Sequence, residues 1–304
     1  MVAFVKVSVL VPVFNGEAHL HECLESILIQ DFRDLEILIS DDGSTDRSLE
    51  IVENFAARDS RIRWWKNPRN LGLTANSNAC LKAARGEYVK FVHQDDKLLS
   101  PAAIKRMVAA LDANPQASLA GSRQHLTGTH SRATLFSKTS GCFDGRNMIV
   151  RCFEQNTNLI GQPTLTLFRS SNAQRGFNEQ FTGHMDCEMW FHLLEQGDFA
   201  YVAEPLATWR VHQNHQTART GNSPNDEHLR FVQDWYAKPW LRDLATDRML
   251  FSQIYYLRKK YGDSASPLTS AMMAQLSPSH YRWQWLKHKI CRPFQQLGRQ
   301  LANQ

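Results

Sequence analysis

The stretch VKVSVLVPVFNGEAHLHECLESILIQDFRDLEILISDDGSTD, residues 5–46, decides the fold class of this chain. Its first part is an apolar, β-branched run that predicts a buried strand over residues 5–13. Apolar residues at helical spacing follow over 17–29, and a second apolar run predicts a strand over 35–40. A strand, a helix and another strand in this order are typical of a parallel pair joined by a crossover helix.

The same alternation continues to about residue 115. We expect helices and strands in turn over residues 45–57, 61–66, 73–84, 88–92 and 101–111, the last with Ser100 as N-cap and Pro101 at its first position. This pattern predicts an α/β fold, with a Rossmann-like, mostly parallel sheet flanked by helices. Ligands of such sheets bind at the carboxyl ends of the strands, so the loops that follow the strands are the candidate site.

The rest of the chain is less regular. Periodicity weakens between about 118 and 180, although residues 163–168 predict a strand, and 186–196 predict a helix that ends before Gly197. The sequence after about residue 225 is helical, basic and aromatic. We therefore expect one domain over 1–224, with halves 1–115 and 116–224, followed by a helical C-terminal extension over 225–304.

Composition excludes some classes of protein. The 304 residues carry a net charge of +5, which is too mild to favour nucleic acid as a partner. Six scattered cysteines form no CxxC pair, which favours reduced thiols in the cytoplasm over structural zinc or a disulfide framework. Charges interrupt every apolar run before it reaches the length of a membrane span. The apolar start lacks the basic region and cleavage site of a signal peptide, so we expect a cytoplasmic protein.

Polar side chains gather in the loops that follow the predicted strands. These loops are residues 12–15, 41–46, 67–72 and 94–96, and none contains a GxGxxG or GxxxxGK[ST] motif. Phosphates must therefore be held in another way. The sequence contains no internal repeat, so a repeat architecture is not expected.

Asp95 and Asp96 end the buried run KFVHQDD as two adjacent carboxylates. Like charges repel, and a divalent cation compensates such a pair. Mg²⁺ or Mn²⁺ held by one or two carboxylates together with substrate phosphates fits this sequence better than a zinc cage. A helix cap or a solvated loop is the alternative. A second acidic loop, with Asp41 and Asp42, lies at the end of another strand, and this second loop favours the metal site over the cap. The carboxylates of Asp41 and Asp42 are suited to accept hydrogen bonds from a base or ribose, so both loops would serve one nucleotide ligand.

The order of these motifs resembles the inverting family-2 glycosyltransferases of GT-A fold. The resemblance rests on VSVLVPVFNGEAHLHECLESIL, EILISDDGSTDRSLEIV and NLGLTANSNACLKAARGEYVKFVHQDD, and it covers about residues 5–215. It implies that residues 1–115 bind a nucleotide-sugar and that 116–224 face the acceptor. The residues that it implies for the nucleotide-sugar are Pro12, Phe14, Asn15, Glu17, Asp41, Asp42, Asn70, Gly72, Asn78 and Asp95.

The resemblance also implies the catalytic and metal residues. Asp96 matches the main metal ligand of a DxD-type motif, with Asp95 beside it, and His212 of the segment WRVH is a further candidate for the metal or the diphosphate. Asp186 of HMDCEMWFHLLEQG falls where the catalytic base sits, although capping of its helix would also explain it.

The chain departs from the family pattern at three positions. His93 stands in place of the first Asp of the metal motif, Ser77 replaces a frequent Arg, and Met185 replaces the Glu that precedes the base. The first two are consistent with a subgroup with NxGLTxNxN and QDD motifs that often uses deoxysugar or hexose donors. The third removes a carboxylate that would tune Asp186.

The C-terminal segment from Tyr281 carries apolar residues at three- and four-residue steps with basic residues among them. This stripe fits peripheral contact with an anionic membrane surface, and it fits packing or a homodimer equally well. Pro293 interrupts any continuous helix. A lipid-linked acceptor, which the resemblance allows, would favour the membrane.

Together these observations predict a metal-dependent inverting hexosyl- or deoxyhexosyltransferase. It would move sugar from a nucleoside-diphosphate-sugar to a glycan or lipid-linked acceptor in surface polysaccharide or glycolipid synthesis. One alternative is a non-catalytic carbohydrate-binding relative, which His93 and Met185 favour. The other is a sugar nucleotidyltransferase, which would need a Gly-rich basic loop where the chain has VPVFNGE.

Overall fold

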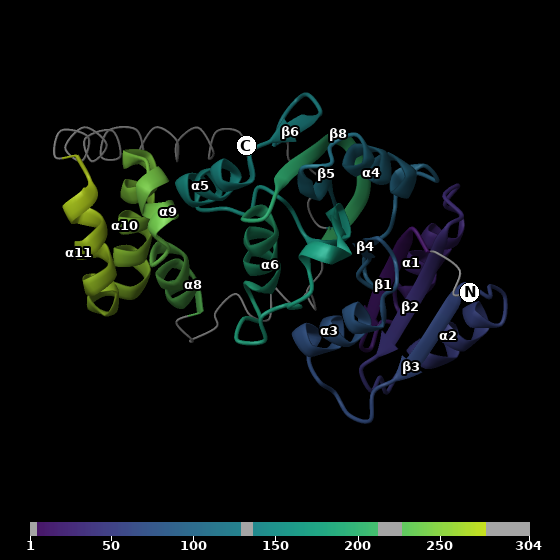
Figure 1. The fold of residues 1–304 in the computed structure, drawn as a ribbon. Coiled ribbons are helices and arrows are strands. Elements are labelled where there is room, and N and C mark those ends of the chain that lie inside the picture. The colour runs from purple at the N-terminus through teal and green to yellow at the C-terminus, as the bar shows by residue number, and fades with distance from the viewer. Residues whose placement is uncertain (1–4, 129–135, 212–226, 278–304) are drawn as a thin grey trace, which may run out of the picture. The chain divides into compact units, whose positions relative to one another are not determined.

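A computed structural model describes residues 5–128, 136–211 and 227–277 of the chain. Its centre is an eight-stranded sheet with the strand order β3-β2-β1-β4-β7-β5-β8-β6 (Figure 1). The strands are β1 (Val7–Val13), β2 (Leu35–Asp41), β3 (Ile62–Lys66), β4 (Tyr88–Phe91), β5 (Ala117–Gly128), β6 (Gly141–Phe143), β7 (Thr166–Arg169) and β8 (Asp198–Val211).

Helices and short 3₁₀ turns connect the strands. The helices are α1 (Leu20–Leu28), α2 (Ser48–Ala56), α3 (Leu73–Ala83), α4 (Ala103–Asp112), α5 (Gly145–Gln155), α6 (Met185–Leu194), α8 (Glu227–Tyr236), α9 (Pro239–Leu244), α10 (Asp247–Tyr261) and α11 (Ser266–Gln275). The 3₁₀ turns are η1 (Pro163–Leu165), η2 (Ser170–Asn172) and η3 (Gly262–Ala265).

Strands β1 to β4 are parallel to one another, as the alternating sequence predicted. β7 lies antiparallel between β4 and β5, β8 runs parallel to β5, and β6 closes the edge antiparallel to β8. The predicted α/β class, a mostly parallel sheet flanked by helices with further helices near the C-terminus, is confirmed. The carboxyl ends of β1 to β4 meet at one edge, which sets the position of the site.

Both faces of the central strands are buried, because helices cover them on two sides. Val7, Val9, Val11 and Val13 share one core cluster with apolar residues of α1, α2 and α4. On the other side an aromatic cluster joins β4, β7 and α6: Phe91 and Phe177 have ring centroids 5.4 Å apart, and Phe168 lies 5.8 Å from Trp190. Burial on both sides explains why the predicted strands read as continuous apolar runs.

The structure corrects several element boundaries. Residues 163–165 form η1, and only residues 166–169 form the strand that was predicted over 163–168. Helix α4 begins at Ala103, with Ala102 at the cap position, so Ser100 and Pro101 precede the helix instead of opening it. Strands β5 and β8 and helix α5 were not predicted from the sequence.

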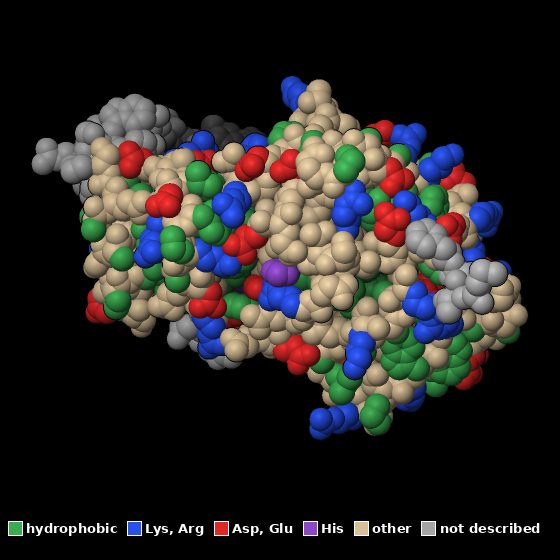
Figure 2. Space-filling model, in the orientation of Figure 1, with side chains coloured by type: hydrophobic (Ala, Val, Ile, Leu, Met, Phe, Trp, Pro, Cys, Tyr) green, Lys and Arg blue, Asp and Glu red, His purple; other side chains and the backbone are tan. Residues whose placement is uncertain are grey.

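The contacts divide the chain into two compact units. One comprises residues 1–148 and 158–227, and the other comprises 149–157 and 228–304. The expected boundary at residue 224 lies close to the second division, but α5 contributes to both units. Figure 2 shows Lys and Arg side chains interspersed with Asp and Glu on the visible face. In the described part of the chain, no helix has both the length and the apolarity to cross a bilayer.

Candidate active site

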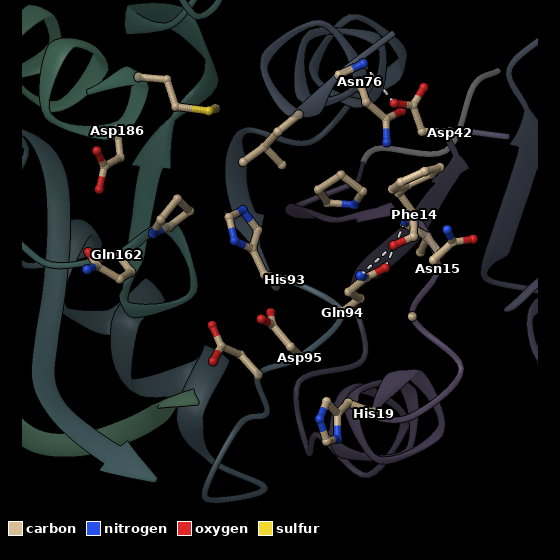
Figure 3. A pocket seen from close by; sticks show the side chains of 18 of the residues that line it. Phe14, Asn15, His19, Asp42, Asn76, His93, Gln94, Asp95, Gln162 and Asp186 are labelled. Atoms are coloured by element: carbon tan, nitrogen blue, oxygen red, sulfur yellow. Dashed lines mark hydrogen bonds between the residues drawn. The ribbon is translucent and has the colours of Figure 1, made fainter. Parts of the chain in front are cut away.

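A cavity of about 780 Å³ opens at the carboxyl ends of β1, β2 and β4 (Figure 3). Its volume is in the range of small-molecule sites. All residues that line it belong to the unit formed by residues 1–148 and 158–227. The sheet edge that the sequence marked as the candidate site is thus also the edge that carries the cavity.

Most of the predicted site residues meet in this cavity. Those that line it are Pro12, Phe14, Asn15, Asp42, Asn70, Gly72, Asp95, Asp96 and Asp186. Glu17, Asp41 and Asn78 are not among the lining residues. His212 lies outside the described residues, as does the amphipathic C-terminal segment.

The loop after β1 is held in place by its two neighbouring loops. The Phe14 amide donates to Oε1 of Gln94 at 2.8 Å, and Nε2 of Gln94 donates back to the Phe14 carbonyl at 2.9 Å. Asn15 adopts a positive φ of 50°, which Asn tolerates well. Its Oδ1 accepts from the Thr45 amide at 2.9 Å. These contacts fix the side chains that face the cavity.

Asp42 organises the loop after β3. Its Oδ1 accepts from Nδ2 of Asn67 and from the Leu71 amide, and its Oδ2 accepts from the Gly72 amide, each at 2.9 Å. The side chain is only 2% exposed. Asp42 therefore shapes the cavity wall near Asn70 and Gly72, in addition to lining it.

Three predicted binding residues have structural partners instead of a place in the cavity wall. Oδ1 of Asn78 accepts from the Phe177 amide at 2.8 Å, and its Nδ2 donates to the Phe177 carbonyl at 3.0 Å. Oε2 of Glu17 accepts from the Arg47 amide at 2.9 Å. Oδ2 of Asp41 accepts from the Ser44 amide at 3.1 Å, while its buried Oδ1 has no partner in the described structure.

The adjacent carboxylates of Asp95 and Asp96 have different surroundings. Asp96 is 3% exposed: Oδ2 accepts from the Thr164 hydroxyl at 2.7 Å and Oδ1 from the Arg210 amide at 2.8 Å. Burial, and then the neighbouring Asp95, raise the pKa of Asp96 to about 8. Asp95 is partly exposed and lies beside the cavity (Figure 3). Both residues line the cavity, and Asp95 is the more exposed of the two.

A buried lysine lies beneath this loop. Lys90 is fully buried on β4, and its ammonium donates to the carbonyls of Thr164 and Thr166, the latter at 3.1 Å. Burial lowers the pKa of Lys90 to about 7, and the nearby Asp96 carboxylate opposes that shift. Lys90 therefore ties β4 to the segment that presents Pro163 and Gln162 to the cavity.

The donor set fits a cation that also binds substrate phosphates. Among the described residues, no group of three or more His, Cys, Asp or Glu side chains is arranged to hold a metal ion. Asp95 and Asp96 supply two carboxylates at the cavity, which is the protein contribution usual for Mg²⁺ beside phosphates. These two residues alone do not complete the coordination of a metal ion.

Asp186 lies in the cavity wall in the first turn of α6. His184, and not Asp186, occupies the N-cap position of the helix. Its Oδ1 accepts from the Cys187 amide at 2.7 Å and its Oδ2 from Nδ2 of Asn158 at 3.2 Å. Desolvation nevertheless raises the pKa of Asp186 to about 6. A carboxylate with that pKa is ionised at neutral pH and is a better proton acceptor than an ordinary aspartate.

Comparison with known proteins decides the family. The model for "Glycosyl transferase family 2" matches residues 8–174, more than half of the chain. The chain belongs to glycosyl transferase family 2. A GalNAc(5)-diNAcBac-PP-undecaprenol beta-1,3-glucosyltransferase of Campylobacter jejuni is 29% identical over 68% of this chain and 65% of its own length. Two other curated relatives are matched over 69% and 31% of their length.

Solved structures share the fold of this family-2 chain. Staphylococcus aureus TarS in complex with UDP-GlcNAc aligns over 93% of this chain and 91% of its own, with a TM-score of 0.63 and 18% identity. A Pyrobaculum calidifontis mannosyltransferase in complex with GDP-Man and Mn²⁺ aligns over 94% and 85%, with a TM-score of 0.55 and 16% identity. The GT-A type of fold is confirmed.

Some cavity residues of this family-2 chain were not found by sequence reasoning. They include His19, Asn76, Gln162, Thr182 and Gly183. Asn76 is buried and connects two loops, since it donates to the Ser40 carbonyl at 3.1 Å and accepts from Asn67 at 3.0 Å. The asparagines of NLGLTANSN were a usable signal, but the choice between Asn76 and Asn78 depends on how α3 is rotated.

Proposed function

We propose that this chain transfers a sugar from a nucleoside-diphosphate-sugar to an acceptor hydroxyl, with inversion at the anomeric carbon. The observation that carries the proposal is that Asp95 and Asp186, from distant parts of the sequence, line one cavity together with the loops after β1 and β3. The relatives and structural neighbours named above, with their UDP-GlcNAc and GDP-Man ligands, support a nucleotide-sugar as the donor.

The donor would bind against the loops after β1, β2 and β3. Phe14 and Asn15 offer an exposed ring and a polar side chain, and Asn70 and Gly72 form the opposite wall that Asp42 holds in place. Pro12 lies at the base of this part of the cavity wall, at the end of β1. Base and ribose contacts are assigned to these loops because they follow the strand ends nearest to the acidic loop of β2.

A divalent cation, Mg²⁺ or Mn²⁺, would be held by Asp95 with help from Asp96, and His212 remains a further candidate ligand. When bound, such a cation acts as a Lewis acid that offsets the charge of the departing diphosphate. Asp96 contributes mainly through position, because Thr164 and Arg210 already bind its two oxygens. Asp95 keeps a partly exposed carboxylate for the ligand role.

Asp186 is the proposed general base. Its carboxylate would take the proton of the acceptor hydroxyl while the acceptor oxygen forms a bond to the anomeric carbon. The bond from that carbon to the diphosphate oxygen breaks in the same step, with its electrons, on the opposite face of the sugar. A general base typically contributes about 10²- to 10⁴-fold to the rate.

For the acceptor, we propose a glycan or a lipid-linked saccharide of surface polysaccharide or glycolipid synthesis. The undecaprenol-linked acceptor in the description of the Campylobacter relative supports the lipid-linked form. A hexosyl or deoxyhexosyl donor, peripheral contact with the cytoplasmic face of a membrane and a homodimer are finer parts of this proposal. The two latter depend on the C-terminal segment after residue 277.

The test is a transfer assay with UDP-, GDP- and dTDP-sugars, with and without Mn²⁺, using mass spectrometry to detect the free nucleotide and the glycosylated product. We expect one nucleotide class to support turnover, which Asp95→Ala and Asp186→Asn should each lower strongly. Donor binding without turnover would support the non-catalytic relative instead. Formation of a sugar nucleotide from a sugar phosphate would support the nucleotidyltransferase.

A further inference from the structure

A carboxylate from outside α6 occupies the start of the helix that carries Asp186. Oε1 of Glu227 accepts from three consecutive backbone amides, those of Thr182 at 2.7 Å, Gly183 at 2.9 Å and His184 at 3.0 Å. Nδ1 of His184 lies 3.8 Å from the same oxygen. One side-chain atom therefore binds the whole turn that leads into the helix.

This contact holds the turn that leads into α6, up to and including the amide of its N-cap residue. The N-cap residue of α6, His184, makes no side-chain capping hydrogen bond. The first amides of a helix have no partners within the helix, and a side-chain oxygen that accepts from them fixes the entry of the chain. Thr182 and Gly183 also line the cavity, so Glu227 determines the position of a part of its wall.

We infer that Glu227 is a positioning residue for Asp186, holding the turn that leads into α6 and placing a second negative charge near the proposed base. The inference rests on the proposed function, in which Asp186 accepts the proton. The charge of Glu227 comes from a distant part of the sequence and acts on the Asp186 carboxylate.

The electrostatics around Asp186 agree with this role. The Asp186 carboxylate accepts from the Cys187 amide and the Asn158 side-chain nitrogen, and these two donors and its own backbone amide stabilise the ionised form. Burial is the largest cause of the raised pKa of Asp186, and the charge of Glu227 raises it further. Glu188, on the same helix, is paired with Arg175 at 2.8 Å, and His184 faces Glu227.

The decisive variant is Glu227→Gln, which keeps an acceptor oxygen for the three amides but removes the charge. We expect the midpoint of the acidic limb of kcat/KM to move to lower pH by roughly half a unit, because a like charge near Asp186 is lost. Glu227→Ala should show the same shift and also lose about 10- to 100-fold in kcat/KM, because the turn that leads into α6 is no longer held. Asp234→Asn, an exposed substitution on α8, is the matched control.

Two further measurements need no turnover. Carboxyl ¹³C NMR should show Asp186 titrating at lower pH in Glu227→Gln than in the unsubstituted protein. Amide hydrogen exchange of residues 182–184 should become faster in Glu227→Ala, whereas Glu227→Asp should restore part of the protection. An Asp186 titration and a pH profile that are the same in Glu227→Gln and in the Asp234→Asn control would overturn the inference. A protein that transfers no sugar would count against the proposed function, and the NMR and exchange data would still decide the role of Glu227.

Discussion

At the scale of single residues, the surroundings of Asp186 predict how the rate of sugar transfer depends on pH. Its pKa is raised to about 6, chiefly by desolvation, so the carboxylate is ionised above that pH and protonated below it. A protonated base cannot accept the hydroxyl proton. Transfer should therefore fall as the pH drops through about 6 and reach a plateau above it. Measurement of kcat/KM between pH 4.5 and 9 tests this fall on the acidic side, the acidic limb of the pH profile.

Asp186→Asn should lower kcat by about 10²- to 10⁴-fold and remove this acidic limb, because the amide cannot accept the proton. The exposed Asp31→Asn serves as the control, since it changes charge equally without approaching the cavity. Retention of the limb in Asp186→Asn would mean that another group takes the proton.

A second residue-scale prediction concerns Asp42, whose two oxygens accept three hydrogen bonds. In Asp42→Asn an amide NH₂ would face at least one of these donors, which costs about 1–3 kcal/mol of stability. The loop of Asn70 and Gly72 should shift, so donor affinity should fall as well. Urea unfolding and nucleotide titration by calorimetry measure the two effects.

Asp41→Asn is the matched comparison, because Asp41 accepts a single backbone hydrogen bond through Oδ2, which the amide oxygen of asparagine can replace. We expect a smaller loss of stability there than in Asp42→Asn. Equal losses at both positions would contradict the role given to Asp42 in shaping the loop.

The sequence predicted which loops meet at the site better than it predicted which atoms face the cavity. Asp95 and Asp96 are adjacent aspartates in one loop, yet the Thr164 hydroxyl and the Arg210 amide bind the carboxylate of Asp96, whereas the Arg210 side chain donates to the backbone carbonyl of Asp95. Both partners come from distant elements. Glu227 is a stronger case, because nothing in its local sequence indicates that its carboxylate will bind amides of residues 182–184.

At the scale of elements, the turn between α5 and η1 can be tested by itself. Oδ1 of Asn158 accepts from the Ile160 and Gly161 amides, each at 3.0 Å, and the Trp190 indole donates to the Gly161 carbonyl at 2.9 Å. Gly161 has a φ of +108°, and a Cβ there would lie 2.8 Å from Cδ1 of Leu165. Residue 161 must therefore be glycine for two reasons, namely the backbone conformation of the turn and the lack of space for a side chain.

Gly161→Ala should destabilise the protein by about 1–3 kcal/mol, because the side chain would force a strained backbone conformation. It should also weaken catalysis, since the same turn places Asn158 against Asp186. Gly141→Ala is the control, because a Cβ at that position makes only ordinary contacts at 3.7 Å. Chemical denaturation compares the two variants, and a stability loss in Gly141→Ala as large as in Gly161→Ala would contradict this account.

The sequence predicted helices and strands correctly where the spacing of apolar residues and the order of the elements along the chain indicated the same fold. Strands β1 to β4 are buried on both faces or joined by helices of clear periodicity, so their order along the sequence was sufficient. Strands β5 and β8 were missed because their pairing is irregular, with register shifts near Ala117, Ser122 and Arg123 that break a simple alternation. β8 also contains Pro205, which argues against a regular strand when only the sequence is considered.

At the scale of the whole molecule, the sheet topology makes the site a composite of the first and second halves of the catalytic region. β7 lies between β4 and β5, and the loop of Asp95 borders one cavity with Gln162 and Asp186, which come from much later in the sequence. In the proposed mechanism, the cation binds both to Asp95 and Asp96 and to the phosphates of the substrate. Binding of nucleotide and binding of cation should be thermodynamically coupled.

We expect Mn²⁺ alone and UDP or GDP alone to raise the melting temperature only slightly. Mn²⁺ alone lacks the phosphate ligands, and the nucleotide alone lacks the cation that would bind its phosphates. Together they should stabilise the protein by more than the sum of the two shifts, and a ligand at 100 times its Kd contributes about 2.7 kcal/mol. Differential scanning fluorimetry with a Mn²⁺ by nucleotide matrix measures the excess. Asp95→Ala should remove the excess while leaving the shift from nucleotide alone, whereas Asp31→Ala should change neither. An excess that survives in Asp95→Ala would show that a different residue binds the cation and would return Asp96 or His212 to the leading position.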